Sequence, residues 1–133
     1  MQTRIGHLVF SVQPVNMPFY RDLLTFLGWQ SIYDTPEMLG LSGGSARVWF
    51  MPVTKDSPND YDGPGLNHLG IAAESIADVD ATVGYLSEHT TSPLFATPRH
   101  RPEFTTNPDE TYYQVMFETP DRILIEVVYT GPK

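Results

Sequence analysis

Apolar and polar positions alternate over short stretches of this chain, which is the pattern of strands with one buried face. The predicted strands cover residues 5–12, 29–34, 38–41, 46–53, 66–73, 94–96, 112–117 and 123–129. Two further segments carry apolar residues at helical spacing. One begins near Asn16 and stops at Gly28, and the other begins at Ser75 with a capping-box pattern. The predicted order is therefore βαβββ, and it occurs twice.

The two predicted βαβββ segments share landmarks at matching places. His7 and His68 each stand third in the opening strand of their segment. Trp49 and Glu126 each lie four residues after the last residue of a tight turn. This correspondence predicts that the four residues occupy equivalent positions in an α+β fold of paired βαβββ modules.

Two polar segments interrupt the repeat. Residues 55–65 are rich in Pro, Gly and Asp, which is typical of a linker. Residues 97–111 show no apolar period and are predicted to form a long loop inserted into the second module, of a length that is usually functional or disordered. We expect a single domain, residues 1–133, made of module 1–54 and module 66–130.

The composition limits both the partners and the location of the protein. The 133 residues include no Cys, 8 Lys and Arg, and 16 Asp and Glu, which gives a formal net charge of −8. This charge disfavours nucleic acid and anionic membranes as partners, and no apolar run is long enough to span a bilayer. The lack of Cys excludes disulfides, thiolate metal ligands and thiol nucleophiles. Because no signal-peptide pattern is present either, we expect a cytoplasmic protein.

Glu126 stands inside the otherwise apolar stretch ILIEVVY. An unpaired carboxylate in a buried strand costs several kcal/mol, on the order of the desolvation penalty of a buried charge. Such a residue needs a partner, which a metal ion, an arginine or a bound proton can supply. A metal ligand and a structural, arginine-paired glutamate are therefore the open alternatives.

His7 and His68 lie on strands whose same-face neighbours include the small residues Ser11 and Gly70, so both imidazoles can face open space. A single histidine on a strand is most often a packed core residue. Two histidines at matching repeat positions, together with a buried glutamate, favour a ligand set instead. Two imidazoles and one carboxylate suit one divalent transition metal such as Zn, Ni, Mn, Fe or Co, with open positions for water or substrate. The candidate metal ligands are His7, His68 and Glu126.

Four stretches of the chain resemble the vicinal oxygen chelate superfamily, which includes glyoxalase I, fosfomycin-resistance proteins, bleomycin-resistance proteins and extradiol dioxygenases. These stretches are IGHLVFSV, FYRDLLTFLGW, GLNHLGIAAESIADVDATVGYL and YYQVMFETPDRILIEVVY. The resemblance implies paired modules in a curled mixed sheet around a metal-binding cup, with the ligands at His7, His68 and Glu126. It also implies a homodimer, whose site can draw His7 from one chain and the other two ligands from its partner.

Two positions depart from the family pattern. Glyoxalase I carries a fourth ligand, usually Glu, where this chain has Trp49, and tryptophan cannot bind a metal. The common Asp-Pro-Asp-Gly hairpin is replaced here by Thr-Pro-Asp-Arg at residues 119–122. A His/His/Glu set matches instead the fosfomycin-type transferases and the extradiol dioxygenases. Authentic glyoxalase I chemistry is therefore disfavoured.

Residues on the two predicted hairpins are candidates for substrate contact. The first hairpin places Arg47 and Trp49 on one face, where Arg47 either binds an anionic substrate group or stays solvated. In the second hairpin, Tyr113 and Phe117 are expected beside Glu126. Tyr113 then orients the substrate or transfers a proton, or it packs as an ordinary core tyrosine.

The predicted loop 97–111 contains the cluster Arg99-His100-Arg101. This cluster is expected either to form a lid over the metal or to be a solvated part of the loop. In the lid, Arg99 contacts the substrate and His100 acts as an acid or base. The catalytic candidates are thus Glu126, Tyr113 and His100.

Two functions of different classes follow from these residues. The first is a divalent-metal-dependent enzyme that acts on a small oxygen-rich molecule by bidentate chelation, as a lyase, isomerase, thiol transferase or dioxygenase. The second is a metal-free protein that sequesters a small molecule, as the bleomycin-resistance proteins do. The three metal-type residues at matching positions favour the enzyme, because a binding protein has no need of them.

Overall fold

A repeated βαβββ unit builds the fold, as the alternation of apolar residues predicts. The computed structural model describes residues 1–133, which form two compact units, residues 1–58 and 59–133. The boundary between the units falls within the predicted linker 55–65. The predicted α+β fold of paired βαβββ modules is confirmed.

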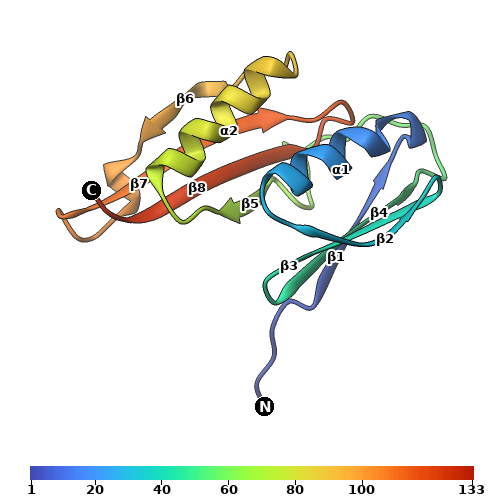
Figure 1. Ribbon diagram of the computed structural model, residues 1–133, viewed down its shortest axis with the longest axis horizontal. Coiled ribbons are helices and arrows are strands. Elements are labelled where there is room, and N and C mark those ends of the chain that lie inside the picture. Colours follow the sequence, from blue (N-terminus) through green and yellow to red (C-terminus); the bar gives the residue numbers. More distant parts are fainter. The chain divides into compact units, whose positions relative to one another are not determined.

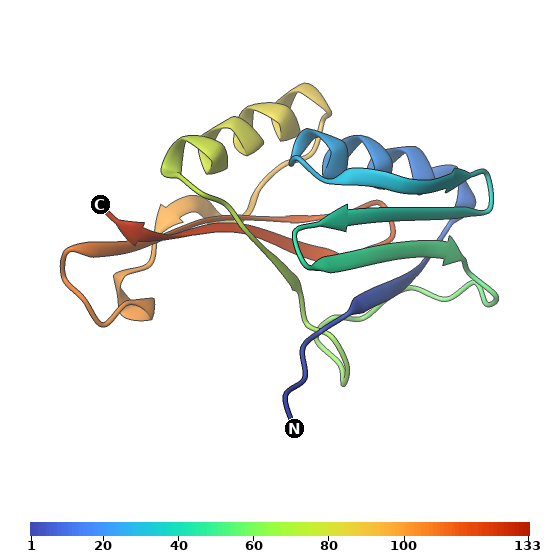
Figure 2. The same cartoon turned by 60° about the horizontal axis from the view of Figure 1, so that its bottom comes forward.

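The first unit is a mixed four-stranded sheet with one covering helix. Its elements are β1 (His7–Val12), the short 3₁₀ helix η1 (Pro14–Asn16), α1 (Met17–Phe26), β2 (Gln30–Thr35), β3 (Met38–Gly43) and β4 (Ala46–Pro52). The strand order is β1-β4-β3-β2, in which β1 runs parallel to β4 and the other neighbours are antiparallel. Figure 2 shows α1 lying along one face of this sheet.

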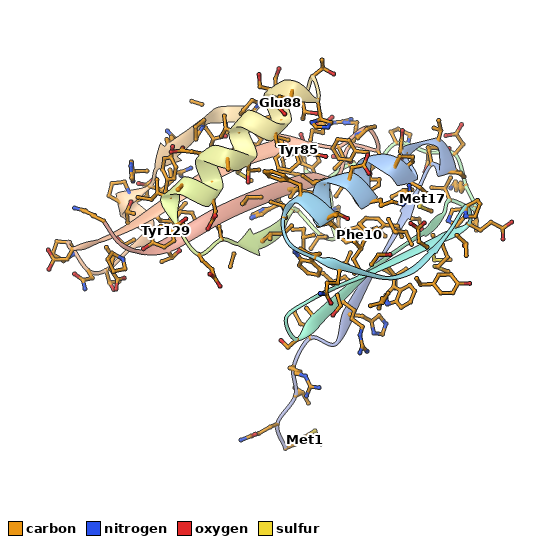
Figure 3. The ribbon with its side chains drawn as sticks, in the orientation of Figure 1. Met1, Phe10, Met17, Tyr85, Glu88 and Tyr129 are labelled. Atoms are coloured by element: carbon orange, nitrogen blue, oxygen red, sulfur yellow. The ribbon has the colours of Figure 1, made fainter.

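Stacked aromatic rings join α1 to its sheet. Tyr20 of α1 is almost fully buried, and its ring centroid lies 4.5 Å from that of Phe50 on β4. Phe10 of β1 stacks on the same Phe50 ring at 5.6 Å, and Figure 3 marks Phe10 together with Met17 at the start of α1. Full burial of a large apolar side chain contributes about 1.5–3 kcal/mol. These contacts fix which face of the sheet the helix covers and leave the opposite face for other contacts.

The second unit repeats the first in element order. Its elements are β5 (Leu69–Ala72), α2 (Ile76–Glu88), β6 (Leu94–His100), the 3₁₀ helix η2 (Pro102–Phe104), β7 (Glu110–Glu118) and β8 (Leu124–Pro132). The strand order is β5-β8-β7-β6, again with the outer strand β5 parallel to its neighbour β8. The helix α2 lies across one face of this sheet (Figure 1). Neither of the two α-helices is long and apolar enough to cross a membrane.

The predicted helix starts have different outcomes. The capping box at Ser75 is confirmed, because its Oγ accepts a hydrogen bond from the backbone N–H of Asp78 at 3.1 Å. Asn16 holds the predicted N-cap position of α1, directly before Met17 and with Pro18 in the first turn. It is also the last residue of η1, and its side chain makes no capping hydrogen bond.

Two further predictions about turns and loops need correction. The tight turn of the first hairpin consists of Gly44 and Ser45, because Gly43 and Ala46 are paired, and Gly44 has the positive φ of 60° that favours glycine. The predicted loop 97–111 is partly a strand, since β6 continues to His100. This strand lies at the edge of its sheet, where a proline and charged residues are tolerated, and they conceal the apolar period.

Candidate metal centre

The backbone register places the predicted ligands at equivalent positions in the two units. In the first unit Val9 is paired with Trp49, and in the second Gly70 is paired with Glu126. His7 precedes Val9 by two residues and His68 precedes Gly70 by two residues. Residues two apart on a strand share a face, so each histidine shares a face with its unit's Trp49 or Glu126. The correspondence predicted from the turns is therefore confirmed by the strand pairing.

His68 and Glu126 meet in the second unit. The Nε2 atom of His68 lies 3.0 Å from Oε2 of Glu126. Glu126 is only 4% exposed, whereas the imidazole lies at the solvent side. The carboxylate is therefore desolvated, and the His68 ring lies between it and the solvent.

The neighbouring asparagine determines which nitrogen of His68 carries a proton. Asn67 donates from Nδ2 to the backbone carbonyl of Tyr61 at 2.9 Å, which leaves its Oδ1 as the acceptor facing Nδ1 of His68 at 2.7 Å. Nδ1 therefore holds a hydrogen, and Nε2 is the ring nitrogen that faces the Glu126 carboxylate. Two electron-rich atoms 3.0 Å apart need a cation between them, either a proton or a metal ion.

Tyr112 completes the surroundings of the carboxylate. Its hydroxyl donates a hydrogen bond to Oε1 of Glu126. Burial and this hydrogen bond raise the pKa of the Tyr112 hydroxyl well above its ordinary value of 10. Tyr112 thus stays protonated and acts as a donor, and it leaves Oε2 as the oxygen that faces His68.

The His68–Glu126 pair fits a divalent metal. Ligand bonds to nitrogen and carboxylate oxygen are about 2.0–2.2 Å long, so two ligands at a right angle are separated by roughly 2.9 Å and two tetrahedral ligands by roughly 3.4 Å. The observed 3.0 Å allows the two atoms to bind one ion, and it is also the distance of a direct hydrogen bond between them. Neither unit by itself gathers three His, Cys, Asp or Glu side chains around one point. Because His7 belongs to the first unit, the three-ligand set remains a prediction.

In the first unit an indole stands where the second unit has its carboxylate. Trp49 is half-buried on the face of the sheet that α1 does not cover, packed over Gly40 of β3 and tilted toward Tyr33 at 6.1 Å. A Cβ atom at Gly40 would lie only 2.5 Å from the indole. The first hairpin pairs Gly40 with Trp49 and Ser42 with Arg47, which confirms the predicted face that holds Arg47 and Trp49.

The predicted role of Tyr113 and Phe117 beside Glu126 is wrong by one residue. Met116 is the residue paired with Glu126, so even-numbered residues of β7 share the Glu126 face and odd-numbered ones lie on the α2 face. Tyr113 accordingly donates its hydroxyl to Oδ1 of Asp80 on α2 at 2.7 Å, and Phe117 is fully buried. The sequence could not reveal this register, because the residues around Glu126 are apolar at both odd and even positions, so alternation does not show which face is buried.

The cluster Arg99-His100-Arg101 is divided between the two faces of the sheet. His100 ends β6 opposite Tyr113, with its ring 4.6 Å from the tyrosine ring and Nδ1 2.5 Å from Oγ1 of Thr111. This places His100 on the α2 face, so its predicted role as an acid or base at the metal is wrong. Arg99 is paired with Gln114 and thus lies on the Glu126 face, where its contact with a substrate remains a prediction.

Three residues of the site were not found from the sequence: Asn67, Tyr112 and Gln114. Asn67 and Tyr112 act through their contacts with His68 and Glu126, and such contacts leave no spacing pattern. Gln114 is 2% exposed, and its Nε2 has no hydrogen-bond partner. The only sequence signal for Gln114 was that it is a polar residue within the otherwise apolar stretch of β7.

The fold and the register together define a class of α+β proteins made of two βαβββ modules, each with a mixed sheet and one helix on one face of it. The sequence model of the Glyoxalase/Bleomycin resistance protein/Dioxygenase superfamily matches residues 4–127. The chain belongs to this superfamily, whose members include enzymes.

Solved structures of low sequence identity share the fold. A putative glyoxalase from Bacillus halodurans is 24% identical with a TM-score of 0.80, and the match covers 96% of each chain. A glyoxalase/bleomycin resistance protein from Albidiferax ferrireducens T118 is 17% identical with a TM-score of 0.71, covering 94% of this chain and 97% of that one. A lactoylglutathione lyase from Agrobacterium tumefaciens is 17% identical with a TM-score of 0.64, covering 96% and 94%. No curated protein matches this chain significantly in sequence.

Proposed function

We propose that the protein is a divalent-metal-dependent enzyme that acts on a small oxygen-rich substrate. The ion is held by His68 and Glu126, and His7 is its third ligand. The observation that carries this proposal is the His68–Glu126 pair, in which Asn67 holds the ring of His68 with Nε2 facing a buried carboxylate oxygen 3.0 Å away. A bound divalent ion supplies Lewis-acid polarisation of substrate oxygens.

The residues around the ion have separate roles in this proposal. Asn67 fixes the ring and tautomer of His68, and Tyr112 holds one oxygen of Glu126 so that the other is directed at the ion. Burial of Glu126 excludes water from the carboxylate and strengthens its interaction with a cation. Because Trp49 replaces a possible fourth ligand, the site keeps more open positions than a His/Glu/His/Glu set.

Metal titration tests this proposal directly. The chelator-treated protein is titrated with Zn²⁺, Ni²⁺, Mn²⁺, Co²⁺ and Fe²⁺ by calorimetry, beside the His68→Ala and Glu126→Gln variants. We expect the parent to bind about one equivalent of at least one ion, and we expect both variants to lose more than 100-fold in affinity for it. This loss exceeds the roughly 10–100-fold expected when the removed residue contacts a metal ligand rather than the metal. The variant Asn67→Ala should lose about 10–100-fold. His89→Ala, on the exposed C-terminal end of α2, is the matched control.

Two results would contradict the metal site. One is a parent protein that takes up none of the five ions, and the other is unchanged affinity in Glu126→Gln. Either result would favour the metal-free binding protein, for which the half-exposed Tyr33 and the Trp49 beside it offer a stacking surface. Equal losses in His7→Ala and His68→Ala would support His7 as the third ligand.

A further inference from the structure

A buried amide on β7 lacks a hydrogen-bond partner on the same face as Glu126. Gln114 is paired with Val128 of β8, two residues along the strand from the Met116–Glu126 pair. Its side chain is 2% exposed, and Nε2 forms no hydrogen bond. An unsatisfied buried donor costs about as much as the hydrogen bond that it fails to make. The acceptor that satisfies such an atom is a water molecule or an atom of a ligand.

A second donor without a bonded acceptor stands across the sheet from Gln114. Arg99 of β6 is paired with Gln114, so both side chains leave the same face of the sheet. Arg99 is exposed, and its guanidinium forms no hydrogen bond or ion pair within the chain, so it is free to bind an anion. Glu103 is already bonded to Arg101, which is the main cause of the lowered pKa of its carboxyl, and the charge of Arg99 adds a smaller effect. The unpaired groups of the two residues are thus the amide N–H donor of Gln114 and the positively charged guanidinium of Arg99, and such groups bind a carboxylate.

The position of the two donors relative to the metal pair limits the size of the ligand. Diagonal neighbours on adjacent strands, such as Gln114 and Glu126, have Cα atoms roughly 7–8 Å apart. A molecule of one six-membered ring, or a chain of similar length, spans this distance. A neutral amide next to the carboxylate also avoids the cost of a second buried charge, which a lysine or arginine at position 114 would carry.

We propose that Gln114 and Arg99 bind a carboxylate of the substrate, whose two adjacent oxygens face His68 and Glu126. The substrate class is thus a small organic acid with vicinal oxygens and a carboxylate about one ring away. This inference rests on the proposed function, because the vicinal oxygens are assigned to the metal. Gln114 and Arg99 act here as specificity-determining residues.

A matched pair of chelators tests the carboxylate site. The protein loaded with one equivalent of Co²⁺ is titrated with 3,4-dihydroxybenzoate and with catechol, which lacks only the carboxylate, and binding is followed by visible absorption and calorimetry. We expect the acid to bind at least tenfold more tightly than catechol, as for a hydrogen bond to a charged group. The ratio of the two affinities, acid over catechol, should fall to about one in Gln114→Met and to a few-fold in Arg99→Gln. Arg4→Gln, an exposed arginine of the first unit, should keep it.

A stability readout separates this role from a merely structural one. Because Met has nearly the shape of Gln but no unsatisfied donor, metal-free Gln114→Met should unfold at a temperature equal to or above that of the parent. A parent that binds both chelators equally well, or a preference retained in both variants, overturns the inference and leaves Gln114 with a structural water only. A marked loss of stability in Gln114→Met, with the preference unchanged in Arg99→Gln, leads to the same conclusion.

Failure of the metal site gives a different result from failure of the carboxylate site. If the parent binds no Co²⁺, the proposed function fails, and benzoate is titrated into the metal-free protein instead. Benzoate binding that is lost in Gln114→Met and Arg99→Gln then still supports a carboxylate site. The absence of any benzoate binding overturns it.

Discussion

Two adjacent tyrosines on β7 provide a matched test of the Glu126 site. Tyr112 donates its hydroxyl to Glu126, whereas Tyr113 donates its hydroxyl to Asp80 on the opposite face of the sheet. The substitutions Tyr112→Phe and Tyr113→Phe remove the same atom and the same kind of hydrogen bond. They differ in the acceptor that is left behind, which is buried in one variant and exposed in the other.

The burial of the two acceptors determines how much each substitution should lower the free energy of unfolding. The Glu126 side chain is 5% exposed, so water cannot replace the lost donor. A hydrogen bond to a charged group is worth about 1.5–3 kcal/mol, and Tyr112→Phe should lower the free energy of unfolding by about 2–3 kcal/mol. Asp80 is exposed, and water takes the place of the Tyr113 hydroxyl, so Tyr113→Phe should lower it by about 1 kcal/mol or less.

Urea unfolding and metal titration measure the two effects. With a slope of about 1–3 kcal/mol per molar urea, Tyr112→Phe should move the midpoint of the metal-free protein down by roughly 1 M or more. The same variant should weaken metal binding by about 10–100-fold, as expected for loss of an outer partner of a ligand, while Tyr113→Phe leaves metal affinity unchanged. Equal destabilisation by the two variants, or equal metal affinities, would refute the assignment of Tyr112 to Glu126.

Two further predictions concern packing and pH. Gly40→Ala places a Cβ atom 2.5 Å from the Trp49 ring and should lower the free energy of unfolding by about 1–3 kcal/mol. Gly84→Ala in α2, where the Cβ meets nothing, should raise it by about 0.5–1 kcal/mol; thermal unfolding of both variants checks the opposite signs. The hydrogen bond to Asp80, and then burial, raise the pKa of Tyr113 to about 12. Because the unfolded chain releases this proton near pH 10, stability should fall as pH rises from about 10 to 12. Urea midpoints at both pH values should show a smaller fall in Tyr113→Phe, and an identical fall would contradict the assigned hydrogen bond.

The repeat could be predicted from the sequence because its landmarks are local. Each hairpin carries its own turn, and the strand that follows continues in fixed alternation, so the position of Trp49 and Glu126 depends only on a short segment. The structure places the first turn one residue later than predicted, at Gly44–Ser45. The equivalence is unaffected, because it depends on the pairing of each residue with the outer strand of its own sheet.

The contacts around Glu126 could not be predicted in the same way. A hairpin predicted from sequence does not show which side chains of β7 share the face of Glu126. Tyr112 and Tyr113 are therefore equally good candidates for the hydrogen bond to Glu126. Only the observed pairing of Met116 with Glu126 selects Tyr112. His100 was predicted in a loop rather than on a strand, since a segment interrupted by Pro98 shows no alternation from which a strand and its faces can be deduced. Side-chain chemistry was thus predicted better than side-chain direction.

The difference between the two units bears on the reaction that the site can support. Trp49 and Glu126 occupy the same register position, but the indole is packed over Gly40, which leaves no room for any other side chain on β3 at that level. The substitution Trp49→Glu would therefore leave a void over Gly40 and place a carboxylate where an indole ring packs. The glycine and the tryptophan form one packing unit, so a fourth ligand cannot be restored by a single substitution. In the proposed function, an ion bound by His7, His68 and Glu126 alone would keep open positions for water and for the oxygens of a substrate.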